Sequence, residues 1–188
     1  MRTIAFLACL AVATPALAAN APPQLAPGAA KQLQALMPKL AKAGSADAAK
    51  PIEAHVLELF RESGSPSIDL LMTRASAAAQ GGDTATASKL LESITDIAPG
   101  FAEAWHIRGM MAAEADQDAV AIVYLNRAIA LNPHQFQAMA DLAGILVEYG
   151  DKKQALQYFR KALAIDPYYE GLDKEVEQLS RDVEGEKI

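Results

Sequence analysis

The sequence lacks most of what a disulfide framework or a nucleic-acid surface would need. It contains one cysteine, Cys9, among 188 residues, and a single cysteine excludes an intrachain disulfide. It has 17 basic and 23 acidic residues, for a formal charge of −6, so it has no basic excess with which to displace counterions from nucleic acid. Aromatic residues make up only 6% of the chain. The core must therefore come from close contacts between small side chains, which favours helices.

The motifs of the common enzyme classes are also missing. The chain has no His-Glu-x-x-His zinc motif, no Gly-x-Ser-x-Gly turn and no phosphate-binding glycine loop. Only His55, His106 and His134 offer an imidazole. The sequence therefore predicts a protein that is not an enzyme, with no catalytic residues, no metal and no cofactor.

The first residues have the layout of a secretory signal peptide. Arg2 precedes an apolar run from Ile4 to Val12, and Ala16-Leu17-Ala18 follows it. The run is shorter than the roughly 20 residues that span a membrane. We therefore expect residues 1–18 to be cleaved and the protein to be exported, in a bacterial periplasm, without stable membrane insertion. Residues 19–28 contain three prolines and one glycine and predict a flexible leader.

From Ala29 onward the pattern is helical almost throughout. Residues 29–43 and 46–62 predict two helices separated by Gly44-Ser45. We assign residues 29–67 to an N-terminal helical pair. This pair is expected to be a degenerate repeat or a cap at the N-terminal end of the helical stack.

The rest of the chain superimposes on itself after a shift of 34 residues. Pro99, Pro133 and Pro167 recur at that interval, and so do the turn pairs at 82–83, 116–117 and 150–151. Three units result, at 68–101, 102–135 and 136–169. Each contains two amphipathic stretches around a turn and ends in a proline, which cannot continue a helix. Each unit is therefore predicted to be a helical hairpin.

These units resemble the tetratricopeptide repeat (TPR). The segments Ala-Glu-Ala-Trp-His-Ile-Arg-Gly at 102–109, Gly-Asp at 150–151 and Lys-Ala-Leu-Ala-Ile-Asp-Pro at 161–167 carry the likeness. The resemblance implies an all-α, right-handed α-solenoid of TPR hairpins. Trp105 is expected to be its largest buried plug. The repeat-defining positions are Trp105, Gly109, Ala121, Tyr124, Ala128, Pro133, Leu142, Gly150, Ala155, Phe159, Ala162 and Pro167.

Arg108 departs from the family pattern, because TPR units usually place leucine there. Its charge could neutralise a carboxylate of the groove from beneath. Alternatively, its stem could lie along apolar neighbours and leave the charge in water.

Residues 170–188 predict a capping helix and tail. Leu172, Val176, Leu179 and Val183 form an apolar stripe, and a solenoid needs a cap because its last hairpin would otherwise expose an apolar face. We expect this stripe to pack on residues 155–163. It could instead mediate a homodimer.

The resemblance also implies a concave groove lined by the first helix of each unit. Carried over position by position, the partner-binding residues are Asp69, Met72, Ser76, Glu103, His106, Met110, Glu114, Gln137, Asp141, Val147 and Glu148. They include five carboxylates and no lysine or arginine. We expect the carboxylates to be solvent-facing and His106 to be a solvated groove histidine.

Such a face favours a protein partner with a Lys- or Arg-bearing segment. The prediction is a periplasmic adaptor or scaffold that holds a peptide or helical segment of another protein. The alternative is a structural envelope subunit that self-associates through its end helices.

Overall fold

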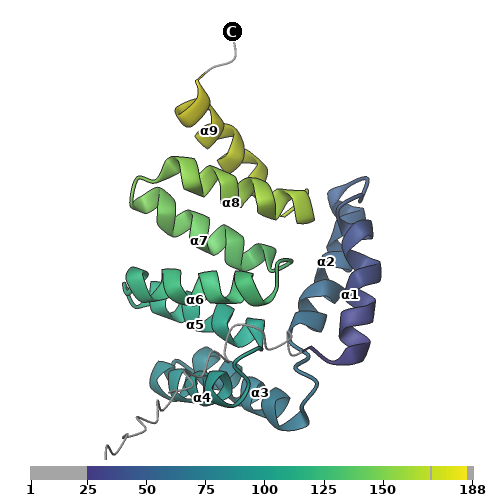
Figure 1. Ribbon diagram of the computed structural model, residues 1–188, viewed down its shortest axis with the longest axis vertical. Helices are drawn as coiled ribbons and strands as arrows, with labels where there is room; N and C mark the ends of the chain where they lie inside the picture. Colours follow the sequence, from purple (N-terminus) through teal and green to yellow (C-terminus); the bar gives the residue numbers. More distant parts are fainter. Residues whose placement is uncertain (1–24, 170, 186–188) are drawn as a thin grey trace, which may run out of the picture.

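The computed structural model describes residues 25–169 and 171–185, and the described residues form nine α-helices and no strand. Figure 1 shows the helices of residues 66–165 stacked as successive hairpins, with the helix of residues 172–184 at one end and the helices of residues 27–60 beside the stack. The helices are α1 (Pro27–Leu40), α2 (Ala46–Phe60), α3 (Pro66–Gln80), α4 (Thr84–Ile97), α5 (Ala102–Glu114), α6 (Asp118–Leu131), α7 (Phe136–Glu148), α8 (Lys152–Ile165) and α9 (Leu172–Glu184). The predicted all-α solenoid of helical hairpins is confirmed.

The turns inside the hairpins follow from the residues that repeat there. Gly82 and Gly150 have φ values of 78° and 80°, in the left-handed region that glycine enters without steric cost. In the first and third hairpins the next residue is an aspartate, Asp83 or Asp151. Its carboxylate accepts a hydrogen bond from the backbone N–H three residues later and so caps the following helix. The second hairpin has Asp116 at φ 56° and Gln117 with no side-chain capping bond. Its turn is therefore the least favourable of the three.

Within a hairpin the two helices approach closely at a glycine. A Cβ built on Gly109 of α5 would lie 2.7 Å from Cγ of Leu125 on α6, and Leu125 is fully buried. Ala121 and Ala128, also on α6, are fully buried too. The small repeat positions thus allow the close contact that the sequence predicted.

Trp105 is less buried than the sequence predicted. The indole is half-buried, its Nε1 donates to the carbonyl oxygen of Pro99 at 3.0 Å, and its ring lies 5.6 Å from that of Tyr124. The indole packs against the cluster that contains Ala121 and Leu125 without being enclosed by it.

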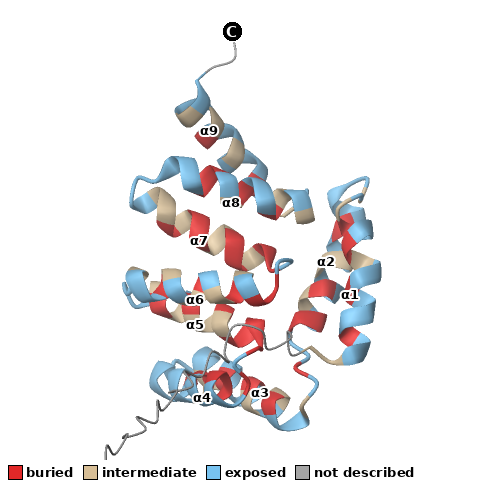
Figure 2. Cartoon of the chain, viewed as in Figure 1, coloured by how far each residue is buried: buried red, intermediate tan, exposed pale blue. Residues whose placement is uncertain are grey.

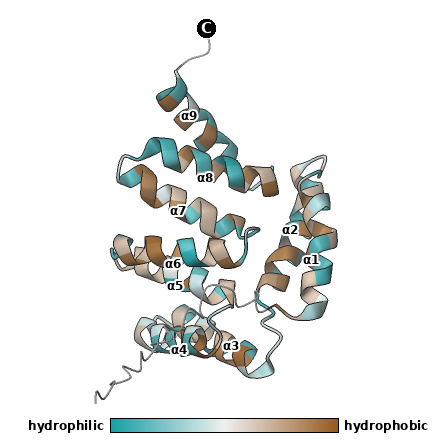
Figure 3. Cartoon of the chain, viewed as in Figure 1, coloured by the Kyte–Doolittle hydropathy of each residue, from teal (hydrophilic) through white to brown (hydrophobic). Residues whose placement is uncertain are grey.

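The terminal helix packs where the sequence predicted. Leu172 and Leu179 belong to one buried cluster with Ala155 and Phe159 of α8, and Figure 3 shows hydrophobic and hydrophilic residues alternating along α9. Two ion pairs between α8 and α9 flank this contact, Lys152–Asp182 and Arg160–Glu184. The predicted packing of the α9 stripe on α8 is therefore confirmed.

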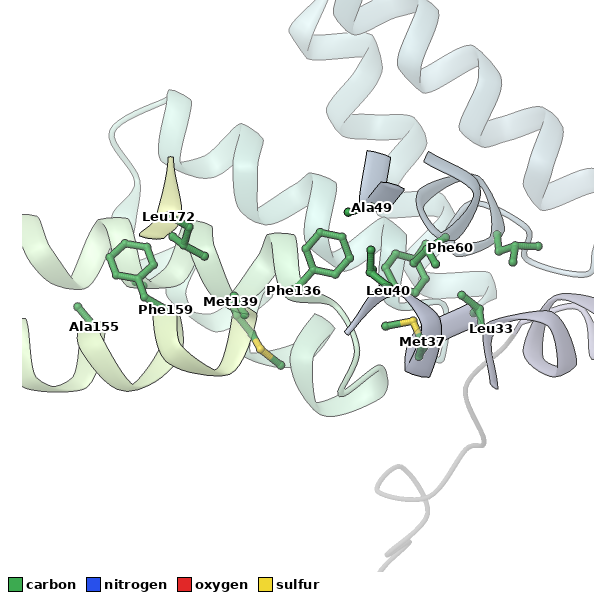
Figure 4. Packing of buried hydrophobic residues seen from close by; sticks show 14 of the residues in the cluster. Leu33, Met37, Leu40, Ala49, Phe60, Phe136, Met139, Ala155, Phe159 and Leu172 are labelled. Carbon is green, nitrogen blue, oxygen red and sulfur yellow. The ribbon is translucent and has the colours of Figure 1, made fainter. Parts of the chain in front are cut away.

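The N-terminal pair lies elsewhere than expected. Its buried side chains join the cluster of the third hairpin, whereas the cluster of the first hairpin draws its buried members from α3, α4, α5 and the loop between α4 and α5. The ring of Phe60, at the end of α2, lies 6.2 Å from that of Phe136 at the start of α7. Figure 4 shows Leu40 and Phe60 beside Phe136, and Figure 2 shows the buried positions of α1 and α2 on the sides that face each other. The expectation of a cap on the first repeat is therefore wrong.

The start of the folded region also differs from the predicted leader. Leu25 and Ala26 pack against the main cluster, the Ala26 N–H donates to the Glu62 carbonyl oxygen at 3.2 Å, and α1 begins at Pro27. Proline suits the first turn of a helix because its missing N–H would have no partner there. Residues 25–28 thus belong to the fold, and the expected signal peptide and residues 19–24 lie outside the described residues.

Candidate functional site

The first helices of the three hairpins, α3, α5 and α7, form one side of the stack, which we call the inner face. The C-terminal end of α2 docks on this face, at Phe136 and Glu103. Docking leaves a cavity of about 560 Å³ between α2, α3 and α5. Its lining residues are Glu58, Arg61, Glu62, Asp69, Met72, Thr73, Ser76, Ala77, Gln80 and Ile107. A volume of this size is typical of a ligand or peptide pocket.

The wall contributed by α2 determines the charge of this cavity. Glu58 and Glu62 lie four residues apart, on one face of the helix and its C-terminal extension. The Arg61 side chain is 71% exposed, and its Nε lies 3.9 Å from Oε1 of Glu103. Arg61, from outside the repeats, thus adds a cation to the cavity that the predicted groove positions of the repeats do not contain.

Three of the predicted groove residues form a polar network that is buried at Glu103 and His106 and half-buried at Asp141. Glu103 and His106 are only 6% and 3% exposed, so the expectation of solvated side chains is wrong for both. His106 Nε2 lies 2.8 Å from Oδ2 of Asp141. Fully buried Gln135 donates from Nε2 to Oε2 of Glu103 at 2.6 Å. The network joins α5, α7 and the loop between α6 and α7.

This network holds His106 in its charged form. Burial by itself lowers the pKa of His106, but hydrogen bonding to Asp141 and Glu103 and their negative charges outweigh it and raise the pKa to about 9. Opposite charges make the buried imidazolium tolerable, since an unpaired buried charge costs far more. Two predicted partner-binding carboxylates thus serve an internal ion pair.

The remaining predicted groove residues fall into two sets. Asp69, Met72 and Ser76 line the cavity, with Met72 only 8% exposed. Oδ1 of Asp69 accepts from the backbone N–H and the hydroxyl of Ser63, at 3.0 and 2.6 Å, so this carboxylate fixes the link between α2 and α3. The others lie outside the cavity. Met110, Glu114 and Glu148 are exposed, and Gln137 and Val147 are half-buried.

Sequence reasoning missed Glu58, Arg61 and Glu62, since α2 was expected to be part of a degenerate repeat or a cap at the N-terminal end of the stack. It also missed the pairing inside the network. The spacing of 35 residues between His106 and Asp141, one more than the repeat length, places them on adjacent inner helices. A histidine beside a carboxylate at that spacing was the signal that could have found this pair.

Arg108 takes up neither of its two predicted roles. Its Nη1 donates to Oγ1 of Thr95 at 2.5 Å and its Nη2 to the Tyr124 hydroxyl at 2.8 Å. The guanidinium carbon lies 4.4 Å from the centre of the Tyr124 ring and 5.3 Å from that of Trp105. Its charge is thus directed away from the inner face and lies beside two aromatic rings that also contact each other.

Neither a metal cluster nor a membrane span is found in the part of the chain that the structure describes. No group of three or more histidine, cysteine or carboxylate side chains within residues 25–185, apart from the undescribed 170, is placed to hold a metal ion. None of the helices in this region combines the length and the apolar character of a membrane span.

Comparison with known proteins bears on the hairpins directly. The family model described as "Tetratricopeptide repeat" matches residues 136–169, which is the third 34-residue unit. The chain therefore contains a tetratricopeptide repeat. A TPR repeat-containing protein of Rhizobium etli is 23% identical over 157 residues, which cover 84% of this chain and 77% of that protein.

Several solved structures share the helical fold. MamA matches 84% of this chain and 84% of its own, with a TM-score of 0.57 and 20% identity. The first TPR domain of Spaghetti (RPAP3), bound to an HSP90 peptide, matches 62% of this chain and 93% of its own, with a TM-score of 0.58 and 17% identity. The Thermobaculum terrenum O-GlcNAc transferase is 25% identical over 61% of this chain, with a TM-score of 0.55, but the match spans only 22% of the enzyme chain.

Proposed function

We propose that this TPR protein is an exported, periplasmic adaptor that holds a segment of a partner protein in the cavity between α2 and α3. The observation that carries the proposal is the open cavity of about 560 Å³ on the inner face. It is lined by α3, the inner helix of the first repeat, and by Ile107 of α5. One similar solved structure, the Spaghetti TPR domain, is bound to a peptide. Export is supported by the layout of residues 1–18.

The chemistry of the cavity favours a segment that carries lysine or arginine beside an apolar side chain. Glu58 and Glu62 provide two carboxylates on one wall. Met72 and Ile107 provide the apolar contacts, and a methionine side chain adapts to different partners. The carboxylates that support this reading are thus those of α2, since Glu103 and Asp141 are engaged with His106.

A cavity-filling substitution tests the location of the site. Ser76 is exposed on α3 and lines the cavity, whereas Arg74 is exposed on the same helix and does not. We expect the chain from Ala19 onward to capture a partner from an envelope extract, and Ser76→Trp to lose it while Arg74→Trp keeps it. Hydrogen exchange of the complex should then slow in α3 and at the end of α2. Equal capture by both tryptophan variants would place the binding site elsewhere.

Charge reversal tests the chemistry of the partner segment. Glu58→Lys combined with Glu62→Lys should abolish capture. Glu114→Lys combined with Glu148→Lys should not, because Glu114 and Glu148 lie outside the cavity. None of the four side chains is buried, so the circular dichroism spectrum should not change. The Lys- or Arg-bearing segment is excluded if the first pair of reversals leaves capture intact while Ser76→Trp abolishes it.

A further inference from the structure

A second cavity lies on the other side of α5 and contains Arg108. It has a volume of about 230 Å³ and lies between α4 and α6, the second helices of the first two repeats, with α5 as its floor. No residue lines both this cavity and the one on the inner face. Arg108 stands here at a position where TPR units usually carry leucine, so a charge replaces an apolar contact between neighbouring repeats.

The guanidinium of Arg108 has donors to spare. An arginine side chain has five N–H donors, of which two are used by Thr95 and Tyr124. No carboxylate of the described residues forms an ion pair with Arg108 within 4.0 Å. Tyr124 and Trp105 hold the planar group in place by ring contacts. A fixed, half-buried guanidinium with no ion-pair partner within 4.0 Å among the described residues is suited to bind a carboxylate through two parallel hydrogen bonds.

The other residues that line the cavity limit the class of ligand that it can bind. Leu91, Met111 and Val120 offer apolar contacts beside the guanidinium, and Val120 is 39% exposed. The exposed carboxylate of Glu92 also borders the cavity and disfavours a dianion such as phosphate more than a single carboxylate. The volume is below the roughly 300–1,000 Å³ of pockets for drug-sized ligands. It therefore suits one residue rather than an extended segment.

We propose that this cavity binds a carboxylate carried on an apolar group, as presented by the C-terminal residue of a partner protein. The site does not depend on the cavity between α2 and α3. It would give the protein a second contact, on the side of the outer helices. A carboxylate on an Asp or Glu side chain shares this chemistry, and small probes of the two kinds separate the sources.

The test uses these probes and the ¹⁵N-labelled chain from Ala19 onward, which retains every described residue. N-acetyl-leucine should shift the Arg108 side-chain Nε–H signal and the amide signals of the cavity residues on α4 and α6, with millimolar affinity. N-acetyl-leucinamide, which lacks the carboxylate, should not. N-acetyl-glutamic acid α-amide presents a side-chain carboxylate. If it binds more tightly than N-acetyl-leucine, the proposed C-terminal residue is overturned in favour of an acidic side chain of the partner.

Matched variants complete the test. Arg108→Leu restores the residue usual in the family, so the fold should accept it, and it should abolish the shifts. Arg74→Leu, which removes an exposed arginine outside the cavity, should leave them unchanged. Glu92→Gln should tighten N-acetyl-leucine binding several-fold by removing a like charge. The proposal is overturned if no carboxylate shifts the signals, if leucinamide shifts them equally, or if Arg108→Leu retains the shifts.

Discussion

The buried ion pair of His106 predicts how the stability of the protein changes with pH. The pKa of His106 is raised from 6.5 to about 9 in the folded protein. In the unfolded chain the imidazole loses its proton near pH 6.5. Its contribution to stability is therefore fully present below pH 6.5 and is lost as the pH rises through about 9. The shift corresponds to about 3 kcal/mol of unfolding free energy.

The change of the unfolding free energy per pH unit is as informative as its total change. Between pH 6.5 and 9 the folded protein holds one proton more than the unfolded chain, so the unfolding free energy should fall by about 1.4 kcal/mol per pH unit at most. His106→Gln removes the titrating group and should flatten this slope. The total stability of His106→Gln is a weaker test, because the variant also leaves buried Glu103 without its neighbouring cation.

Urea unfolding at a series of pH values from 6 to 10 measures the slope for the native chain, for His106→Gln and for His55→Gln. His55 is exposed on α2, and its substitution should leave the slope unchanged. Imidazole NMR signals give the folded pKa of His106 independently. The reasoning is refuted if the native chain and His106→Gln have the same slope, or if His106 titrates near pH 6.5.

Two further predictions concern the packing and the turns of the repeats. Gly109→Ala should destabilise the protein by about 1–2 kcal/mol in urea unfolding, because the new methyl group would meet buried Leu125 at 2.7 Å. Gly144→Ala, where a Cβ meets nothing within 4 Å, should instead stabilise it by about 0.5–1 kcal/mol, and equal signs for the two would contradict the packing argument. Asp116→Gly combined with Gln117→Asp gives the second turn the residues of the third, and should add about 1–2 kcal/mol. An unchanged urea midpoint would show that neither the positive φ nor the missing cap costs stability.

The hairpins could be predicted from the sequence because their determinants are local and recur. Pro99, Pro133 and Pro167 end the units, and small residues mark the close approaches between helices. Arg108 could be recognised from the sequence as a departure from the TPR pattern, which usually has leucine at this position. Its position between Thr95 and Tyr124 could not be predicted, because the outcome depends on two neighbouring helices at once.

The position of the N-terminal pair could not be predicted for a similar reason. An amphipathic stripe shows that a helix must pack against something, but it does not identify the surface that receives it. The ring of Phe60 could have packed on either end of the stack. It contacts Phe136, which also lies 5.2 Å from Tyr169. Because this docking was missed, Glu103 was expected to face solvent, although it lies beside Arg61 of the docked pair.

The docked pair changes how specificity can arise on this repeat scaffold. In the second and third repeats, Glu103 and Asp141 are bound to His106, so altering them would disturb the link between α5 and α7. Glu58 and Glu62 lie outside the repeats and are not buried, so they can change with little effect on repeat packing. For the proposed partner segment, the residues best placed to select it are therefore Glu58, in α2, and Glu62, just after it. In this protein, the chemistry of the cavity can vary independently of the repeats that support it.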